Sequence, residues 1–130
     1  MANPNIVSVS SILGGNAGFN LSNTLTATLI TVDSDKLVKI NRITCANVDG
    51  SSSADLDLFI DGLGSGASGV TTTGADATVY LAKTVAVPAD TTLVVLDTPI
   101  YLMEGDILKG GASANGDLDL FVSYEVLDDA

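Results

Sequence analysis

The segment KLVKINRITCANV, residues 36–48, indicates the fold more clearly than any other part of the chain. Apolar and polar side chains alternate along it, which is the pattern of a β-strand with one buried face. The apolar positions change parity between Ile40 and Ile43. Because a strand that keeps one buried face can change parity only by an irregularity, we predict a β-bulge or bend near Asn41-Arg42.

Similar alternation recurs on both sides of this segment, with turn residues about every 8–12 positions. The expected strands cover residues 24–31, 36–48, 54–60, 78–87, 92–96, 98–103, 107–113 and 117–126. Asn115-Gly116 before the last of them is a strong hairpin signal. No stretch has helical periodicity. We therefore predict an all-β protein, an antiparallel β-sandwich of jelly-roll type with eight or nine short strands, with a small barrel as the alternative.

The length of 130 residues predicts a single domain with an ordinary hydrophobic core. We expect residues 1–22 to form an amino-terminal arm and first strand, packed on or beside a sandwich domain of residues 23–130. Residues 61–76 are rich in Gly, Ser and Thr without periodicity, and they predict a long loop. The sequence shows neither a signal peptide nor an apolar stretch of the roughly 18 residues that a membrane span needs.

Charge and composition exclude several classes of function. The chain has 5 Lys+Arg against 16 Asp+Glu, a net charge of −11, and it has neither His nor Trp. Such a chain repels phosphate, so we expect no nucleic-acid partner and no anionic membrane partner. The lack of His excludes His-based triads and imidazole switches. The single cysteine, Cys45, is interpreted as a small buried apolar residue. We therefore expect a protein that is not an enzyme and acts by contact.

Three pairs of aspartates resemble fragments of a Ca²⁺ ligand set. They are Asp33 and Asp35, Asp55 and Asp57, and Asp117 and Asp119. None has the spacing of a known calcium loop, and two carboxylates about 7 Å apart on one strand face are far apart for a single ion. We interpret the acids as a solvated surface, and we predict no metal site, no catalytic residues and no cofactor.

Contact residues are predicted from two features. The pattern DLDLF occurs at residues 55–59 and again at 117–121, with the leucines facing inward and Phe59 and Phe121 facing outward. Exposed aromatic residues are enriched where a partner docks. The apolar amino-terminal segment, which contains Ile6, Val7 and Val9, is suited to laying an arm on a neighbour by strand addition. These five residues are the predicted interaction sites.

Several turn and strand segments also carry a likeness to a known family. They are MANPNIV at 1–7, NVDG at 47–50, VPADTTL at 87–93, IYLMEGD at 100–106 and SYE at 123–125. Together they resemble the small virion structural proteins of tailed phages that infect marine cyanobacteria, over nearly the whole chain. The resemblance implies a particle component on the capsid, neck or tail and carries over no catalytic residue. The loop at 61–76 is longer than the tight turn of the family pattern.

Charge, fold and resemblance together predict a capsid decoration or cement protein on the outer surface of the virion. Its expected partners are the major capsid protein or other virion proteins, and a second copy in a homo-oligomer, with a trimer favoured. One alternative is a virion structural protein of the tail, neck or a fibre. A second alternative, from a different class, is a carbohydrate- or calcium-binding β-sandwich module.

Overall fold

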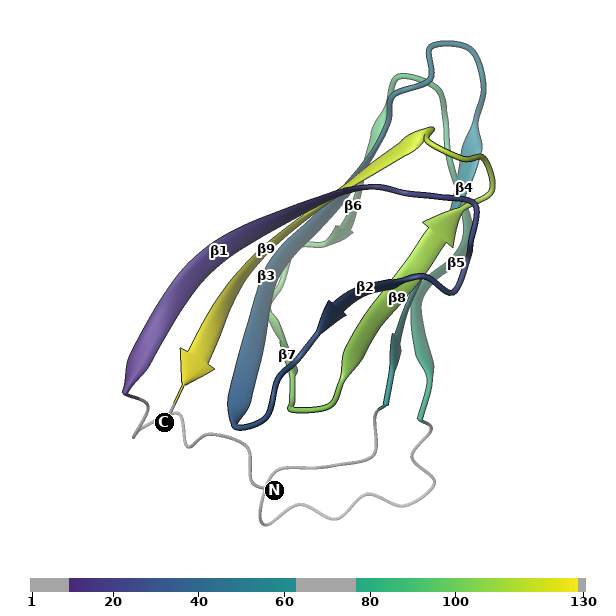
Figure 1. Ribbon diagram of the computed structural model, residues 1–130. Helices are drawn as coiled ribbons and strands as arrows, with labels where there is room; N and C mark the ends of the chain where they lie inside the picture. The colour runs from purple at the N-terminus through teal and green to yellow at the C-terminus, as the bar shows by residue number, and fades with distance from the viewer. Residues whose placement is uncertain (1–9, 63–76, 129–130) are drawn as a thin grey trace.

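The computed structural model describes residues 10–62 and 77–128. Within these ranges the chain forms nine strands, without any helix, in two antiparallel sheets that pack against each other (Figure 1). The strands are β1 (Ser11–Asn20), β2 (Thr28–Thr31), β3 (Lys36–Asn47), β4 (Ala54–Asp61), β5 (Val79–Val87), β6 (Thr92–Leu96), β7 (Ile100–Leu102), β8 (Ile107–Ala112) and β9 (Leu118–Asp128). The predicted antiparallel sandwich of eight or nine strands is confirmed, with two separate sheets instead of one barrel.

The two sheets divide the chain unevenly. The five-stranded sheet has the order β1-β9-β3-β6, with β7 also pairing with β3, and the four-stranded sheet has the order β2-β8-β4-β5. In Figure 1 the chain leaves the upper end of β1 and descends into β2, so the first connection crosses from one sheet to the other. The last strand, β9, lies between β1 and β3. Both described ends of the chain therefore belong to the same sheet.

The core lies between the sheets and is built from the inward side chains of both. Its largest fully buried members include Ile40, Ile43, Leu56, Leu58, Leu102, Leu108, Leu118 and Leu120. Burying each such side chain stabilises the fold by about 1.5–3 kcal/mol. Because β3, β4 and β9 supply most of this set, they form the rigid centre that positions the outward-facing residues.

The predicted irregularity in the longest strand is confirmed. The pairing of β3 with β9 shifts register between Ile40 and Arg42, which leaves Asn41 as the extra residue. This shift allows Ile40 and Ile43, at positions of opposite parity, both to reach the core with no exposed surface.

The hairpin predicted at Asn115-Gly116 is wrong. Strand β8 belongs to the four-stranded sheet and β9 to the five-stranded sheet, so the turn joins the two sheets. Gly116 does adopt a left-handed conformation, with φ of 84°. The dipeptide therefore identified a tight turn correctly, but the local backbone does not determine which strands pair.

The strand expected at residues 24–31 is shorter than predicted, since β2 covers only Thr28–Thr31. The chain before it still follows the edge of β8: Ala112 donates its N–H to Ser22 O at 2.9 Å, and Gly110 donates to Ala27 O at 3.0 Å. Leu25, an apolar residue of the predicted strand that lies before β2, is exposed.

Candidate functional site

The structure places the two predicted phenylalanines on different sheets. Phe59 lies in β4 of the four-stranded sheet, and Phe121 lies in β9 of the five-stranded sheet. They therefore do not form one patch. The other predicted contact residues, Ile6, Val7 and Val9, lie outside the described residues, as does most of the expected 61–76 loop.

The prediction that Phe59 is exposed is wrong, because its side chain is only 5% exposed. Its ring packs against Tyr80 of β5, with the ring centroids 4.9 Å apart. The Lys83 ammonium lies 4.4 Å from the Tyr80 centroid. Phe59 does point to the outer face of its sheet, as the alternating pattern of its strand indicates. The pattern of one strand does not reveal, however, which side chains of the neighbouring strand cover the ring.

Asp57, next to Phe59 in the repeated pattern, is also buried instead of solvated. Its carboxylate accepts a hydrogen bond of 2.7 Å from the backbone N–H of Thr84. Thr84 has a φ of 52°, in the left-handed region that residues other than glycine seldom adopt. The register between β4 and β5 shifts on both sides of Leu58. Asp57 thus supports an irregular backbone and is part of the scaffold.

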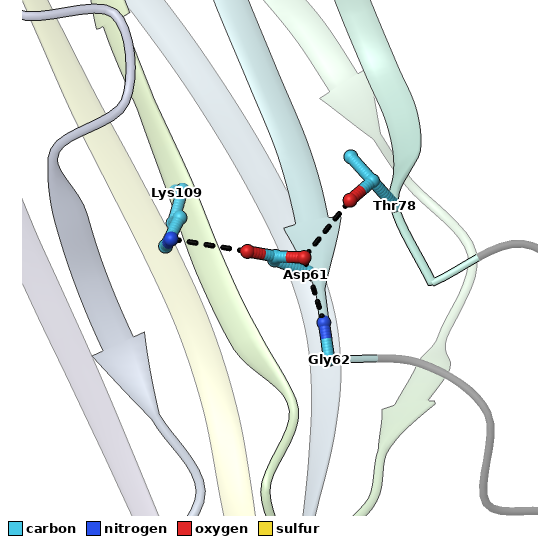
Figure 2. Close-up of polar contacts among 4 residues, drawn as sticks. All are labelled: Asp61, Gly62, Thr78 and Lys109. Carbon is cyan, nitrogen blue, oxygen red and sulfur yellow. Dashed lines mark hydrogen bonds and ion pairs between the residues drawn. The ribbon is translucent and has the colours of Figure 1, made fainter.

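Asp61, the last residue of β4, contacts Lys109 of β8 and Thr78, the residue directly before β5 (Figure 2). Its Oδ2 accepts from the Lys109 ammonium at 3.0 Å, and its Oδ1 accepts from the Thr78 hydroxyl at 2.9 Å and from the Gly62 N–H at 3.0 Å. The bond from Lys109, followed by those from Thr78 and Gly62, lowers the pKa of the Asp61 carboxyl. Every polar partner stabilises the ionised form, so this group is a structural link between strands.

Among the residues that the structure describes, the remaining acids do not assemble into an ion site. Asp119 accepts a 2.7 Å hydrogen bond from the Asn20 side-chain amide. Ser51, through its backbone N–H and its hydroxyl, lowers the pKa of Asp49. Burial, followed by the charge of Asp49, raises the pKa of Asp117. In the part of the chain that the structure describes, no group of three or more His, Cys, Asp or Glu residues could hold a metal ion.

The outer face of the five-stranded sheet carries a row of small and apolar residues across four strands. Phe121 of β9 pairs with Gly18 of β1 on one side and with Thr44 of β3 on the other, and Thr44 pairs in turn with Val94 of β6. Directly paired residues point to the same face of a sheet. We call Gly18, Phe121, Thr44 and Val94 the Phe121 row.

The Phe121 row is open to solvent. Phe121 is 45% exposed and Val94 is 44% exposed. A hollow of about 450 Å³ surrounds the ring and is also lined by Gly18, Thr44 and Ala46. Because these neighbours are small, they leave the flank of the phenyl ring uncovered. The Asn20–Asp119 hydrogen bond borders the hollow on its polar side.

The row lies on a face with both signs of charge nearby. Arg42 is exposed one row away and, among the described residues, takes part in no ion pair. Lys39 and Glu125 pair across the strands at 3.8 Å. A partner with apolar and acidic groups would therefore meet the ring and a nearby cation on this surface.

Cys45 lies beneath this face with no exposed surface, so its predicted burial is confirmed. Burial, with a smaller contribution from the charge of Asp119, raises the pKa of the thiol to about 11. A thiol with this pKa is almost wholly protonated at neutral pH and is a poor nucleophile.

Sequence reasoning missed Gly18, Thr44 and Val94 as parts of one surface. They lie far apart in the sequence, and only the register of the sheet brings them together. The sequence carries one signal for this surface: in the alternating pattern of their strands, Thr44 and Val94 occupy positions that face outward.

Comparison with protein-family models finds none that matches this chain, and comparisons with curated proteins and with solved structures find no match either. Among the described residues, no helix has the length and apolar character needed to cross a bilayer.

Proposed function

We propose that this chain is a structural subunit of a tailed-phage virion, and more specifically a decoration or cement protein that binds the outside of the capsid through the face carrying the Phe121 row. The observation that carries the proposal is this exposed row of one aromatic, one apolar and two small residues on the outer face of the five-stranded sheet, in a chain of net charge −11. Exposed aromatic anchors are often the centre of a protein interface, with polar and charged residues around them at the rim.

The rest of the chemistry supports action by contact. Asp57 and Asp61 are occupied in holding strands together, and the thiol of Cys45 is buried. An acidic coat keeps a protein soluble at high local concentration and away from packaged DNA. The resemblance of the turn and strand segments to small virion structural proteins supports the same class of function.

The mechanism would be stabilisation by mass action. A subunit that binds only the mature shell stabilises it by RT ln(1 + [L]/Kd), where [L] is the free subunit concentration, which gives about 2.7 kcal/mol at 100 times Kd. No covalent step is needed. The partner is the major capsid protein or another protein of the shell.

Location on the tail, neck or a fibre is the alternative within the same class. Copy number distinguishes the two, since a decoration protein is present in hundreds of copies per particle and a neck or tail-tip protein in a few dozen at most. Quantitative protein staining of purified particles, relative to the major capsid protein, measures this ratio. A ratio at the level of the tail proteins would overturn the capsid assignment.

The contact itself is tested by substitutions of exposed residues on the two sheets. We expect Phe121→Ser to weaken binding to particles that lack the protein by roughly 30-fold or more, the effect of losing a hot-spot aromatic. Val94→Ser, on the same row, should also weaken it. Val79→Ser is the matched control because Val79 is 45% exposed on the four-stranded sheet, against 44% for Val94. Equal binding by all three variants would place the contact elsewhere.

A second candidate function is glycan binding at the same hollow. It is favoured by one observation, the position of an exposed aromatic ring beside the Asn20–Asp119 pair in a 450 Å³ hollow. A few polar groups beside an apolar surface are typical of a small-molecule site. A glycan library tested by thermal shift decides the question: a melting temperature that rises with one glycan and not in Phe121→Ser supports it, and no shift at millimolar concentrations rejects it. Addition of Ca²⁺ in the same assay tests the calcium-binding alternative.

A further inference from the structure

Strand β1 has an edge that pairs with no other described strand and lacks the usual protection. It is the outermost strand of the five-stranded sheet, and no described strand pairs with its other side. Its ten residues, SILGGNAGFN, contain neither a charged residue nor a proline, and they pair with β9 without any register shift. Edge strands of monomeric proteins are normally short, bulged or marked by charges and proline, which prevents pairing with another chain.

The other edges of the sandwich are protected. Strand β2 has four residues and a register shift against β8. Strand β5 carries Lys83 and shifts register twice against β4. Strand β6 has five residues and one shift against β3. Only β1, among the described strands, presents a long and regular edge.

The hydrogen-bonding pattern identifies which backbone groups face this edge. Leu21 donates its N–H to Leu118 O at 2.9 Å, in register with the β1–β9 ladder. On the far side of β9, Val48 donates to Asp117 O at 2.8 Å, which fits the same alternation. Residues of an antiparallel strand alternate between its two neighbours. Odd-numbered residues of β1 therefore bond to β9, and the even-numbered residues turn their N–H and C=O groups to the open edge: Ile12, Gly14, Asn16, Gly18 and Asn20.

Side chains of β1 are also left uncovered. Ile12 is 58% exposed and Leu13 is 60% exposed, on opposite faces of the strand. A strand added beside β1 would cover part of both. In a chain of net charge −11, β1 is a ten-residue surface on which two copies can meet without bringing like charges into contact.

We propose that two copies of this protein pair through their β1 edges, antiparallel and about a twofold axis, to form one sheet that continues from β6 of one copy to β6 of the other. For the two strands to hydrogen-bond, the edge-facing residues of one copy must lie opposite the edge-facing residues of the other. Two registers meet this requirement over nine residues of β1. The twofold axis passes through Gly15 in one register and through Asn16 in the other. In these registers Leu13 lies opposite Ala17 or Phe19 of the second copy, so an exposed leucine gains an apolar neighbour. A twofold arrangement of this kind closes at two subunits.

The inference goes beyond the proposed function, because the dimer forms through backbone groups and needs no shell. It would place two copies of the Phe121 row on the same side of one continuous sheet, since Gly18 belongs both to the row and to β1. Loss of the dimer and loss of particle binding are therefore measured in separate assays.

Sedimentation equilibrium of the full chain tests the proposal. We expect a dimer with twice the chain mass of 13.2 kDa at micromolar concentrations. Asn16→Lys should raise the dimer dissociation constant by at least about 10-fold, since it places two like charges close to the twofold axis. Thr92→Lys on β6 makes the same charge change away from this edge and should leave the dimer intact.

Two further measurements keep the test independent of folding. Asn16→Pro removes one edge-facing N–H without touching the bonds to β9, so it should also yield a monomer, with its β-sheet circular dichroism retained. Amide hydrogen exchange of the wild type should show protection at even-numbered β1 residues that disappears on dilution, while odd-numbered residues stay protected. A monomer at all concentrations up to about 1 mM, a trimer, or a dimer unchanged by both Asn16 variants would overturn the proposal.

Discussion

Phe121 of β9 lies directly opposite Gly18 of β1, and a methyl group added at Gly18 would meet no other atom within 4 Å. The side of the phenyl ring that faces Gly18 is therefore open, and even a methyl group at Gly18 would not contact it. The same strand shows the reverse situation at Gly15, where an added Cβ would lie 2.9 Å from Cζ of Tyr124. One glycine leaves space on the outer face, and the other makes room for a tyrosine on the inner face.

These two glycines give a matched pair of substitutions. We expect Gly18→Ala to be neutral or to stabilise the protein by about 0.5 kcal/mol, because alanine lowers the backbone entropy of the unfolded chain. Gly15→Ala should be less stable than Gly18→Ala by about 1 kcal/mol, because the Tyr124 ring must move. Urea denaturation of both variants measures the difference. Equal stability of the two would show that the Tyr124 contact imposes no constraint.

Removing the Asp57 carboxylate should destabilise the fold. Asp57→Ala leaves the N–H of Thr84 without its 2.7 Å charged partner at a partly buried position, at a cost of about 1–3 kcal/mol. Thr84→Gly, in contrast, relieves the φ of 52° and should not lower stability by more than about 1 kcal/mol. Thermal and urea unfolding measure both. A neutral Asp57→Ala would mean that the hydrogen bond makes no net contribution.

The Asp61 link should be sensitive to pH. Its pKa lies below the usual 3.8, so the stability it contributes is present above that value and is lost as the pH falls through the lowered pKa. We expect Asp61→Asn to be less stable than the wild type at pH 7 and the difference to shrink in strong acid. Asp97→Asn, an exposed turn residue, is the control for the loss of one negative charge. A difference between wild type and Asp61→Asn that does not change with pH would contradict this account.

Cys45 should report global unfolding. Its thiol is fully buried and has a pKa of about 11, so we expect native protein to react with an aromatic disulfide reagent at least about 1,000-fold more slowly than unfolded protein at pH 8. Reaction rates with and without urea test this directly. Rapid labelling of the native protein would show that β3 opens locally.

Periodicity was sufficient for much of the fold. The long strand β3, its irregularity at Asn41 and the inward leucines of β4 and β9 were predicted from alternation alone, because a half-buried strand constrains every second residue. Strand pairing was not predicted correctly. The turn at Asn115-Gly116 is tight as expected, yet it joins two sheets, since pairing depends on contacts distant in sequence.

The candidate site was predicted in part. Phe121 has the outward, exposed position that the pattern indicated, whereas Phe59 has the same parity and is covered by Tyr80. The interpretation of the acidic residues as a solvated surface does not hold for all of them. Asp57 and Asp61 form hydrogen bonds that support the four-stranded sheet. Whether an outward residue is exposed depends on its cross-strand neighbours, and these are known only once the register is known.

The most direct test of the central claim is a density map of the intact particle at a resolution that traces this chain. We predict hundreds of copies on the outside of the capsid, with the face that carries Phe121 and Val94 buried against the shell. Copies on the shell that leave this face in solvent, or a protein restricted to the neck or tail, would contradict it.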